Sequence, residues 1–405
     1  MIKNKIAVVN IFFPPNTRGG ATRIVADECS ILNESYGNEF ELVVFTANTN
    51  STNYYSLNVY PYNGFRVYQA TVALTESTNR REKDEKIGEL FDKFLEFEQP
   101  DLVHFHCIQA LTASIVEVTK NRSIPHLVTI HDAWWISDHQ FLIDKYGKVY
   151  PDGHPNLLDE VNLPDDTTLE ESFMRRAYLK RLLNESNGVL AVSERFRHIY
   201  EINGIQNVIT NKNGISNEVS WLPKNTMHIE RVVCAHIGGM SLHKGFDIFK
   251  QAVINLDAPN IEVLIVDHSK DENYSSITYW GSTIVNIIGH VYQEHIGSLY
   301  GRIDVLFAPS TCPESFGLVT REAAACGCWV VGSDIGAIGE DITVENGFRI
   351  TPTAENLLEV LKKIDKNSKK YKGISKSQYV RYSSEQVDEL IDIFKKTIKP
   401  KKDAD

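Results

Sequence analysis

Residues 305–332 read VLFAPSTCPESFGLVTREAAACGCWVVG, which is the pattern of a strand, a turn, a helix and a second strand. Val305–Ala308 and Trp329–Gly332 are apolar runs without strict alternation, as is typical of strands that are buried on both faces. We expect a helix over Leu318–Cys326, between the two strands. This order of elements predicts a parallel β-sheet that is covered by helices.

The same alternation of strands and helices continues on both sides of this stretch. We expect one series of strands at Lys5–Phe12, Glu41–Thr46, Asp101–His106, His126–Ile130 and Gly188–Val192, and a second at Arg231–Ile237, Glu262–Val266, Ile284–Ile288, Val305–Ala308 and Trp329–Gly332. Further helices are expected at Ala21–Asn33, Glu82–Glu98, Thr168–Asn184 and Phe246–Leu256. Two such series predict an α/β fold of two doubly wound, Rossmann-like domains.

An Asn-rich segment with little periodicity, residues 211–226, separates the two series and is the predicted linker. The predicted domains are therefore residues 1–210 and residues 227–380. Residues 383–398 are amphipathic and open with Ser383 and Gln386, spaced as in a capping box. We expect this last helix to return to the first domain.

Composition excludes some classes of protein. The chain has 405 residues, of which 42% are hydrophobic and 23% are charged, so a largely disordered chain is excluded. The formal net charge is −11. Because nucleic-acid binding rests on clustered Lys and Arg, we expect no nucleic-acid partner.

The compartment that the sequence indicates is the cytoplasm. The apolar run Ile6–Phe13 is too short to cross a bilayer and lacks the cleavage site of a signal peptide. The six cysteines are scattered, which is typical of reduced thiols rather than of a disulfide framework.

Two acidic residues follow the strand Val305–Ala308. Glu314 lies in the turn, and Glu322 lies eight residues later in the expected helix. The first amides of that helix have no partner within the helix and suit a phosphate, whereas a carboxylate suits the hydroxyl groups of a sugar. The alternative is one acid that favours the helix dipole and a second that lies on an exposed helix face.

The segment ESFGLVTREAAACG, which holds Glu314 and Glu322, resembles the signature of the retaining GT-B glycosyltransferases of family 4, also called glycosyl transferases group 1. Shorter matches occur in the same order at Arg18-Gly19-Gly20-Ala21, Asp101–His106, Thr129-Ile130-His131-Asp132, Val192-Ser193-Glu194, Asn213-Gly214-Ile215, Lys244-Gly245 and Gly289-His290-Val291. The resemblance implies two Rossmann-like domains that face each other across a cleft. It also implies transfer of a hexosyl group from a nucleotide diphosphate sugar, such as a UDP- or GDP-sugar, with retention of configuration.

The resemblance also implies roles for individual residues. Glu314 would contact the donor sugar, and Glu322 would accept hydrogen bonds from the ribose. The backbone of Gly289–Val291 would meet the base, and Lys244 would neutralise the leaving diphosphate. The implied donor-binding residues are Gly19, Gly20, Lys244, Gly289, His290, Val291, Glu314, Phe316, Gly317, Leu318, Val319 and Glu322. The implied catalytic residues are His131, Lys244 and Glu314, with no metal ion and no cofactor besides the nucleotide sugar.

The chain departs from the family pattern in two places. Many relatives carry an Arg five residues before the Lys, where this chain has Gly239. One of the two expected cations is therefore missing, unless His243 or a distant Arg replaces it. Many relatives have a Gly-rich turn after the strand Glu262–Val266, where this chain has Asp267–Asp271. Contacts from that turn to the nucleotide are therefore not implied.

In the first domain, Gly19 and Gly20 permit close backbone approach, although a tight turn alone would also use them. The resemblance puts His131 beside the donor sugar and the diphosphate, with a hydrogen-bonded loop histidine as the alternative, and Asp132 would fix its tautomer or bind the acceptor. His104 and His106 alternate on one strand and are expected to pack and line the cleft rather than to bind metal.

Trp134 and Trp135 are acceptor-binding candidates, because exposed aromatic faces stack on sugar rings, but packing is an equal alternative. The helix with Arg175, Arg176, Lys180 and Arg181 is expected to be solvated, with peripheral contact to an anionic membrane as the alternative.

The expected acceptor is a saccharide or a lipid-linked saccharide of a cell-surface polymer. The alternatives are a GT-B phosphorylase, a sugar-nucleotide epimerase and a silent sugar-nucleotide-binding relative. The missing G-x-G-x-x-G fingerprint disfavours a dehydrogenase.

Overall fold

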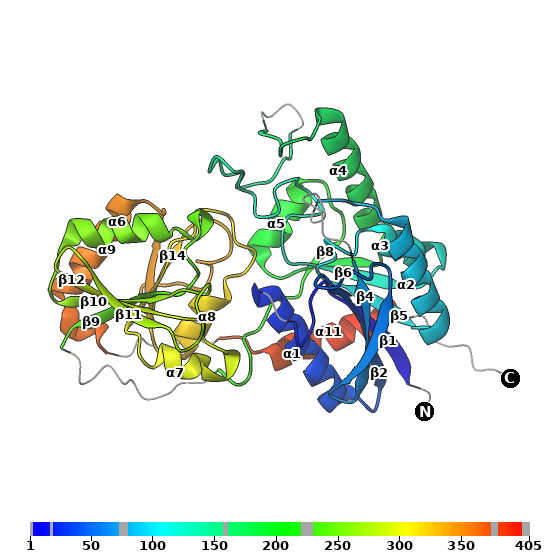
Figure 1. Cartoon of the computed structure of the whole chain (residues 1–405), viewed down its shortest axis with the longest axis horizontal. Coiled ribbons are helices and arrows are strands. Elements are labelled where there is room, and N and C mark those ends of the chain that lie inside the picture. The colour runs from blue at the N-terminus through cyan, green and yellow to red at the C-terminus, as the bar shows by residue number, and fades with distance from the viewer. Residues whose placement is uncertain are drawn as a thin grey trace. The chain divides into compact units, whose positions relative to one another are not determined.

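The computed structural model describes residues 3–16, 19–72, 80–156, 161–219, 230–373 and 380–398. They form two compact units, each built on one sheet (Figure 1). Unit 1 consists of Met1–Gln140, Asp152–Gly214 and Tyr382–Asp405, and unit 2 consists of Phe141–Pro151 and Ile215–Arg381. None of the helices in these ranges is long and apolar enough to cross a membrane.

The sheet of unit 1 has the strand order β3-β4-β2-β1-β5-β6-β7-β8. All neighbours pair in parallel except β3 and β4, so the predicted parallel sheet is confirmed. The β3–β4 hairpin and β8 lie outside the prediction. β3 and β8 are edge strands that lack a continuous apolar run, whereas β4 lies between β3 and β2 and is mostly buried. The strands are β1 (Asn4–Val9), β2 (Phe40–Asn48), β3 (Leu57–Tyr62), β4 (Phe65–Thr71), β5 (Leu102–Phe105), β6 (His126–Ile130), β7 (Gly188–Ala191) and β8 (Val208–Thr210).

Six helices are described in unit 1, and several begin at a side-chain cap. Thr168 accepts a hydrogen bond from the amide of Glu171 in a capping box, and Ser193 accepts one from Phe196. The helices are α1 (Gly19–Tyr36), α2 (Glu85–Glu98), α3 (Ser114–Asn121), α4 (Leu169–Asn184), α5 (Glu194–Ile202) and α11 (Ser383–Thr397).

Helix α11 belongs to the core of unit 1, although it comes from the end of the chain. Val387, Leu390, Ile391 and Phe394 are buried in the same cluster as residues of β1, β2 and α1. The capping box predicted at Ser383 and Gln386 is wrong. The box begins one residue earlier than predicted, at Tyr382, whose amide donates a hydrogen bond to the carboxylate of Glu385. The side chain of Gln386 turns inward and accepts a hydrogen bond from the amide of Gly214.

The beginning of the predicted linker packs against α11. Asn211 and Asn213 are buried, and the Asn211 side chain donates to the carbonyl oxygen of Gln386 at 3.2 Å. Residues 220–226 of the predicted linker lie outside the described residues.

The sheet of unit 2 has the order β11-β12-β10-β9-β13-β14-β15, and only β11 and β12 are antiparallel. The strands are β9 (Val232–His236), β10 (Ile261–Val266), β11 (Ser275–Trp280), β12 (Thr283–Ile288), β13 (Val305–Ala308), β14 (Trp329–Ser333) and β15 (Gly347–Ile350). The helices are α6 (Phe246–Leu256), α7 (Ile296–Tyr300), α8 (Leu318–Ala325), α9 (Ala354–Lys366) and α10 (Ser368–Tyr371), with short 3₁₀ turns η2 (Leu242–Lys244) and η3 (Gln293–His295). The quoted strand–helix–strand unit is β13–α8–β14, and its two strands are parallel neighbours.

Candidate functional site

Two loops of unit 2 lie against each other at the carboxyl ends of adjacent central strands. We call residues 237–245 the β9 loop and residues 309–317 the β13 loop. The Thr311 amide donates to the carbonyl oxygen of His243 at 2.9 Å, and the Thr311 hydroxyl donates to that of Leu242 at 3.3 Å. Gly245 has φ of 70°, and a Cβ there would lie 2.0 Å from the carbonyl oxygen of Pro309. Glycine is therefore required where the loops meet.

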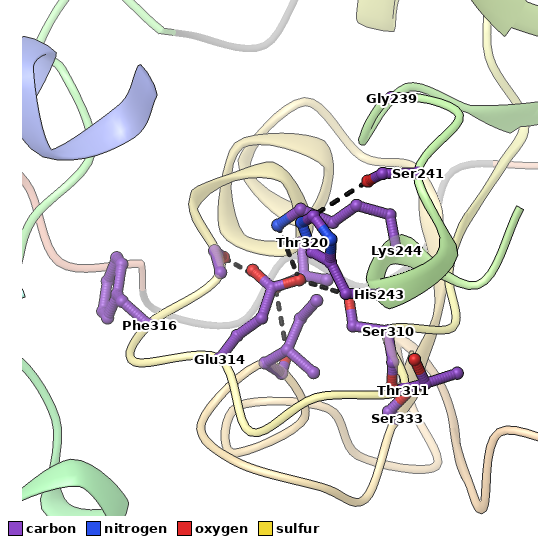
Figure 2. A network of polar contacts seen from close by, with 12 residues as sticks. Gly239, Ser241, His243, Lys244, Ser310, Thr311, Glu314, Phe316, Thr320 and Ser333 are labelled. Atoms are coloured by element: carbon purple, nitrogen blue, oxygen red, sulfur yellow. Dashed lines mark hydrogen bonds and ion pairs between the residues drawn. The ribbon is translucent and has the colours of Figure 1, made fainter. Parts of the chain in front are cut away.

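An ion pair joins these two loops. Lys244 Nζ lies 2.9 Å from Glu314 Oε1, and the two side chains keep 29% and 15% of their exposure (Figure 2). The Ser310 hydroxyl also donates to Glu314 Oε1. Burial raises the pKa of Glu314, but the Lys244 charge and the Ser310 hydrogen bond outweigh burial and hold it below its ordinary value. Burial likewise lowers the pKa of Lys244, and attraction to Glu314 raises it above its ordinary value. Both groups are therefore charged at neutral pH.

Helix α8 begins at Leu318, four residues after Glu314. Gly317, the residue before the helix, has φ of 84°, and no side chain caps the helix there. A Cβ at Gly317 would lie 2.6 Å from Ile338 Cγ1, so glycine is required at this point. The backbone of Gly317, Leu318 and Val319 thus presents amides at the positive end of the helix dipole.

Arg321 holds this turn in place, and the sequence analysis did not identify it. Its buried guanidinium donates to the carbonyl oxygens of Phe316 and Gly317 and to Asp341 Oδ2 at 2.7 Å. It also lies 3.9 Å from the ring centroid of Phe316, which is buried. The signal in the sequence that could have identified Arg321 is an Arg within an expected helix of small residues. The arrangement fixes the backbone of the donor-binding candidates Phe316 and Gly317.

Glu322 is the second acid of the signature, and it lies inside unit 2. Only 1% of the residue is exposed, and its Oε2 accepts a hydrogen bond from the Tyr300 hydroxyl at 2.9 Å. The ribose contact implied for Glu322 stays a prediction.

The segment Gly289–Val291 follows β12, as expected. A Cβ at Gly289 would lie 1.7 Å from the carbonyl oxygen of Asp271, so this backbone passes very close to the loop after β10. The His290 ring packs edge-on against His268 of that loop, at 5.8 Å between centroids.

The two departures from the family pattern lie next to each other. His268 comes from the loop after β10, and its ring carbon lies 3.8 Å from where a Cβ on Gly239 would be. His243, the other candidate replacement for the missing cation, stacks on Phe141 at 5.4 Å with an interplanar angle of 5°.

In unit 1, Gly19 begins α1 with φ of 77°. Apart from its chain neighbours and its own helix backbone, no heavy atom of the described residues lies within 4 Å of the position of its absent Cβ. Gly20 is the second residue of the helix. Arg18 lies outside the described residues. The open space at Gly19 leaves the backbone accessible where the sequence predicts donor contacts.

His131 and Asp132 follow β6, where the sequence places them. His131 is half-buried, and its Nε2 lies 3.0 Å from Nδ1 of His106 on β5. Burial and the neighbouring His106 lower the pKa of His131 well below its ordinary value. Asp132 accepts hydrogen bonds from the side chains of Gln109 and Gln140, each at 2.7 Å, and from the Trp134 amide. The Asp132 carboxylate therefore stabilises the loop that carries it.

Two expectations about exposed side chains are corrected. Trp134 and Trp135 are 2% and 3% exposed and pack edge to face, so neither offers a free ring face to a sugar. Arg175 is not part of a solvated helix face. It is buried, and it donates to the carbonyl oxygens of Arg80, Ser137 and Trp134 at 2.7–3.1 Å. The packing alternative therefore describes this region.

Glu28, His104 and His106 could together hold a metal ion, because one potential ligand atom from each lies within 4.8 Å of the others. All three residues are buried in unit 1. The sequence predicts packing rather than metal binding for the two histidines.

Comparison with protein families gives two matches that follow each other along the chain. The model described as Glycosyltransferase Family 4 matches residues 18–218, and the model described as Glycosyl transferases group 1 matches residues 223–381. The whole sheet of unit 2 and all strands of the unit 1 sheet except β1 lie within these ranges.

Two curated relatives are similar over part of their length. A phosphatidyl-myo-inositol mannosyltransferase of Propionibacterium freudenreichii is 28% identical over 107 residues, 26% of each chain. An uncharacterized glycosyltransferase of Methanocaldococcus jannaschii is 24% identical over 265 residues, 63% of this chain and 61% of the relative. The matches thus span less than two thirds of either relative.

Solved structures share the fold over nearly the whole chain. Sucrose-phosphate synthase from Thermosynechococcus elongatus has a TM-score of 0.70 at 15% identity and covers 97% of this chain and 99% of its own. The Anabaena protein HepE, in complex with UDP-glucose, has a TM-score of 0.66 at 16% identity and covers 97% and 99%. Because the identities are low, these likenesses concern the fold, which matches the expected two-domain α/β class.

Proposed function

The chain belongs to the retaining glycosyltransferases of family 4, the glycosyl transferases group 1, and on this premise we propose that it transfers a hexosyl group from a nucleotide diphosphate sugar to a hydroxyl group of a saccharide or lipid-linked saccharide. The observation that carries the proposal is the Lys244–Glu314 pair at the open first turn of α8. An ammonium and helix amides suit a diphosphate, and a carboxylate beside them suits the hydroxyl groups of the sugar.

The proposed step needs no covalent enzyme intermediate. The bond between the anomeric carbon and the diphosphate oxygen breaks, and a new bond forms from that carbon to the acceptor oxygen on the same face. The acceptor proton passes to the departing phosphate oxygen, and the nucleoside diphosphate leaves. Lys244 stabilises the negative charge that grows on the diphosphate, so its attraction is stronger in the transition state than in the ground state.

The pair also explains why Glu314 suits binding rather than proton transfer. Its pKa lies below the ordinary value because Lys244 and Ser310 stabilise the carboxylate, so it is a poor general acid at neutral pH. An ionised carboxylate accepts hydrogen bonds from sugar hydroxyls and orients the donor. The proposed role of Glu314 is therefore to hold the sugar.

The relatives suggest candidate donors and acceptors. HepE is described in complex with UDP-glucose, and the Propionibacterium relative is named as a mannosyltransferase that acts on a phosphatidyl-myo-inositol. We therefore propose glucosyl and mannosyl nucleotides as the first donors to test, and a lipid-linked or free saccharide of a cell-surface polymer as the acceptor. Thermal-shift measurements with UDP, GDP, dTDP and ADP would identify the base, because a bound nucleotide raises apparent stability.

Mass spectrometry of sugar nucleotides incubated with the protein tests the reaction. A glycosyltransferase consumes the donor and extends an added saccharide by one hexosyl unit. An epimerase converts the donor without an acceptor, and a phosphorylase needs inorganic phosphate. A silent relative binds the nucleotide and leaves it intact. Only the first outcome agrees with the proposal.

One accompanying expectation and one alternative have direct tests. We propose that Lys244 and the α8 amides carry the diphosphate charge without a metal ion, so activity lost to EDTA and restored by Mg²⁺ or Mn²⁺ would contradict this. Peripheral membrane contact through α4 is tested by co-sedimentation with anionic and neutral liposomes. Because Arg175 is buried, Lys180 and the half-exposed Arg181 would have to carry the contact.

A further inference from the structure

Three side chains of the kinds that bind metal ions meet inside unit 1. Glu28 comes from the middle of α1 and is 2% exposed. His104 lies on β5 and His106 directly follows it, and they are 0% and 1% exposed. Glu28 Oε1 lies 3.2 Å from His104 Nδ1 and 3.5 Å from His106 Nε2. One carboxylate oxygen therefore meets one nitrogen of each of two imidazole rings.

These close contacts lack the geometry of hydrogen bonds. Within the described residues, Glu28 Oε1, His104 Nδ1 and His106 Nε2 are all enclosed, and none of the three atoms has a hydrogen-bond partner. A ring N–H that pointed at the carboxylate would satisfy both atoms at such a distance, so neither ring is turned that way. Because buried polar atoms nearly always have a partner, three adjacent atoms without one need an explanation.

The spacing of the three atoms fits a shared cation. Ligand atoms that bind a tetrahedral ion at about 2.0–2.1 Å lie about 3.3–3.4 Å from each other, close to the two measured separations. All three atoms lie within 4.8 Å of one another. The lone pairs of such ligands point to the ion rather than to each other, so an ion explains the missing hydrogen bonds.

Charge balance also favours a cation at this place. Among the described residues, no Lys or Arg pairs with Glu28, and its ion-pair contacts are the two imidazoles. A carboxylate that is buried without a cation is strongly destabilising. A divalent ion would supply the positive charge while both imidazoles bind it as neutral ligands.

The outer nitrogens of both rings have the second contact that a metal-bound imidazole uses. His104 Nε2 lies 2.7 Å from the Thr129 hydroxyl, and His106 Nδ1 lies 3.0 Å from Nε2 of His131. An imidazole that binds an ion through one nitrogen carries its proton on the other, where a further group accepts it and fixes the ring. Both rings are therefore oriented from behind.

We propose that Glu28, His104 and His106 bind one divalent transition-metal ion, for which Zn²⁺ is the best match. Two imidazoles and a carboxylate are a ligand set of Zn²⁺ and leave one position for a water molecule. The ion would join α1 to β5. Because its ligands are buried, its role is to stabilise unit 1 and not to contact the substrate. The sequence predicts packing here, and the three unpartnered atoms are the reason to prefer an ion.

Metal analysis of the full chain, without a histidine tag, tests the site. Because the ligands are buried, metal-free protein is prepared by unfolding it with a chelator and is then refolded with or without ZnCl₂. We expect about one equivalent of bound zinc and a Tm higher by about 5 °C or more. Less than about half an equivalent, or an unchanged Tm, would overturn the proposal. Acid unfolding of unit 1 should be measured on the metal-free sample, because an ion would compete with protons for His104.

Glu28→Gln removes the anionic ligand and keeps the shape of the side chain. Loss of an outer contact of a ligand costs about 10- to 100-fold in metal affinity, so loss of a ligand should cost at least about 100-fold. Without zinc the variant should be at least as stable as the wild type, because a buried charge without a cation is removed. Glu34→Gln, on the exposed side of α1, is the matched control and should bind zinc like the wild type. Unchanged zinc affinity of Glu28→Gln, or an equal loss of its stability with and without zinc, would overturn the proposal.

X-ray absorption at the zinc edge identifies the ligands in the wild type, and it decides even if Glu28→Gln does not fold. We expect nitrogen and oxygen neighbours at about 2.0–2.2 Å, with the scattering pattern of two imidazole rings. Sulfur neighbours at about 2.3 Å would place the ion on cysteines and overturn the proposal.

The inference does not rest on the proposed function. Metal content, zinc affinity and Tm are measured without a substrate, so a failure of the proposed reaction and a failure of this inference are distinguishable. The diphosphate charge remains assigned to Lys244 and the α8 amides. Zinc that restores stability after chelation is therefore consistent with a transfer step that uses no metal ion.

Discussion

Both units place a poorly exposed carboxylate beside nitrogen groups near the carboxyl end of a strand, but the nitrogen groups differ between the units. In unit 2 the partner of Glu314 is an ammonium, and in unit 1 the partners of Glu28 are imidazoles. An ammonium stays protonated at every physiological pH, whereas an imidazole titrates in this range. The pair in unit 2 is therefore a permanent pair of charges, whereas burial in unit 1 lowers the pKa of His104 to about 4 and keeps this imidazole neutral at pH 7.

Exposure separates the two groups further. Glu314 keeps 15% of its side-chain exposure and lies on a loop beside an open helix end, so a ligand can reach it. Glu28 keeps 2% and lies in the middle of a helix, so its contacts are with its own unit. The comparison teaches that the same kind of side chain lies at a partly exposed loop in one unit and is enclosed in the other.

The largest expected effect is that of Lys244→Met, which tests whether the unit 2 pair is the catalytic one. Removal of the ammonium leaves the developing diphosphate charge without its cation, so kcat should fall about 100- to 1000-fold. Release of nucleoside diphosphate measures the rate. The control is Lys366→Met, an exposed lysine of α9. A variant that folds and turns over at a near-normal rate would remove Lys244 from the mechanism.

Acid should affect unit 1 before unit 2. The folded pKa of His104 is about 4, below its ordinary value, so the unfolded chain binds more protons as pH falls from 6.5 towards 4. Stability is therefore present above pH 6.5 and should fall by about 2 kcal/mol between pH 7 and 5. The Glu314 contribution is lost only below the ordinary pKa of a glutamate, because its folded pKa is lowered.

Urea unfolding of the wild type and of His104→Gln at pH 7 and pH 5 measures this difference. The variant should lose less stability than the wild type over this range, while His290→Gln, which changes an exposed ring, should behave like the wild type. A stability difference between wild type and His104→Gln that is equal at both pH values would contradict the assignment.

Glycine substitution distinguishes the tightly packed loops of unit 2 from the open turn of unit 1. Gly245 and Gly19 have φ of 70° and 77°, but only a Cβ on Gly245 would collide, 2.0 Å from the carbonyl oxygen of Pro309. Gly245→Ala should therefore reduce the free energy of unfolding by about 2 kcal/mol and weaken nucleotide binding, and Gly19→Ala should cost about 1 kcal/mol. Chemical denaturation measures both. An equal loss in the free energy of unfolding for the two variants would show that the contact with Pro309 does not contribute.

The smallest expected effect is that of Tyr300→Phe, which removes the hydroxyl that donates to Glu322. We expect a loss of about 1 kcal/mol in stability. The control is Tyr279→Phe, since Tyr279 is 64% exposed. Thermal unfolding of both variants checks the expectation, and a Tyr300→Phe variant as stable as the control would show that the bond contributes nothing.

The sequence predicts the buried parts of the fold best. Central strands such as β9 and β13 are continuous apolar runs, so both were predicted within two residues of their ends. The hairpins β3–β4 and β11–β12 have exposed strands, β3 and β11, whose polar residues interrupt the pattern. Both exposed strands were missed for this reason.

Partners that lie far apart in the chain explain the remaining errors. Arg175 appeared to be a surface residue because its three carbonyl partners, 38 to 95 residues away, are invisible to a local pattern. Glu28 lies on a helix and was overlooked because its imidazole partners come from a strand that is distant in the sequence. Arg321 has two carbonyl partners only four and five residues away, but its role depends on a helix start whose geometry the sequence does not specify.

The central claim is that the diphosphate of the donor binds where the β9 and β13 loops meet. A crystal structure of the protein soaked with UDP-glucose or another sugar nucleotide that stabilises it tests this most directly. We predict phosphate oxygens within hydrogen-bond distance of Lys244 Nζ and of the amides of Gly317–Val319, with the sugar beside Glu314. A nucleotide sugar bound elsewhere, with these groups untouched, would contradict the account.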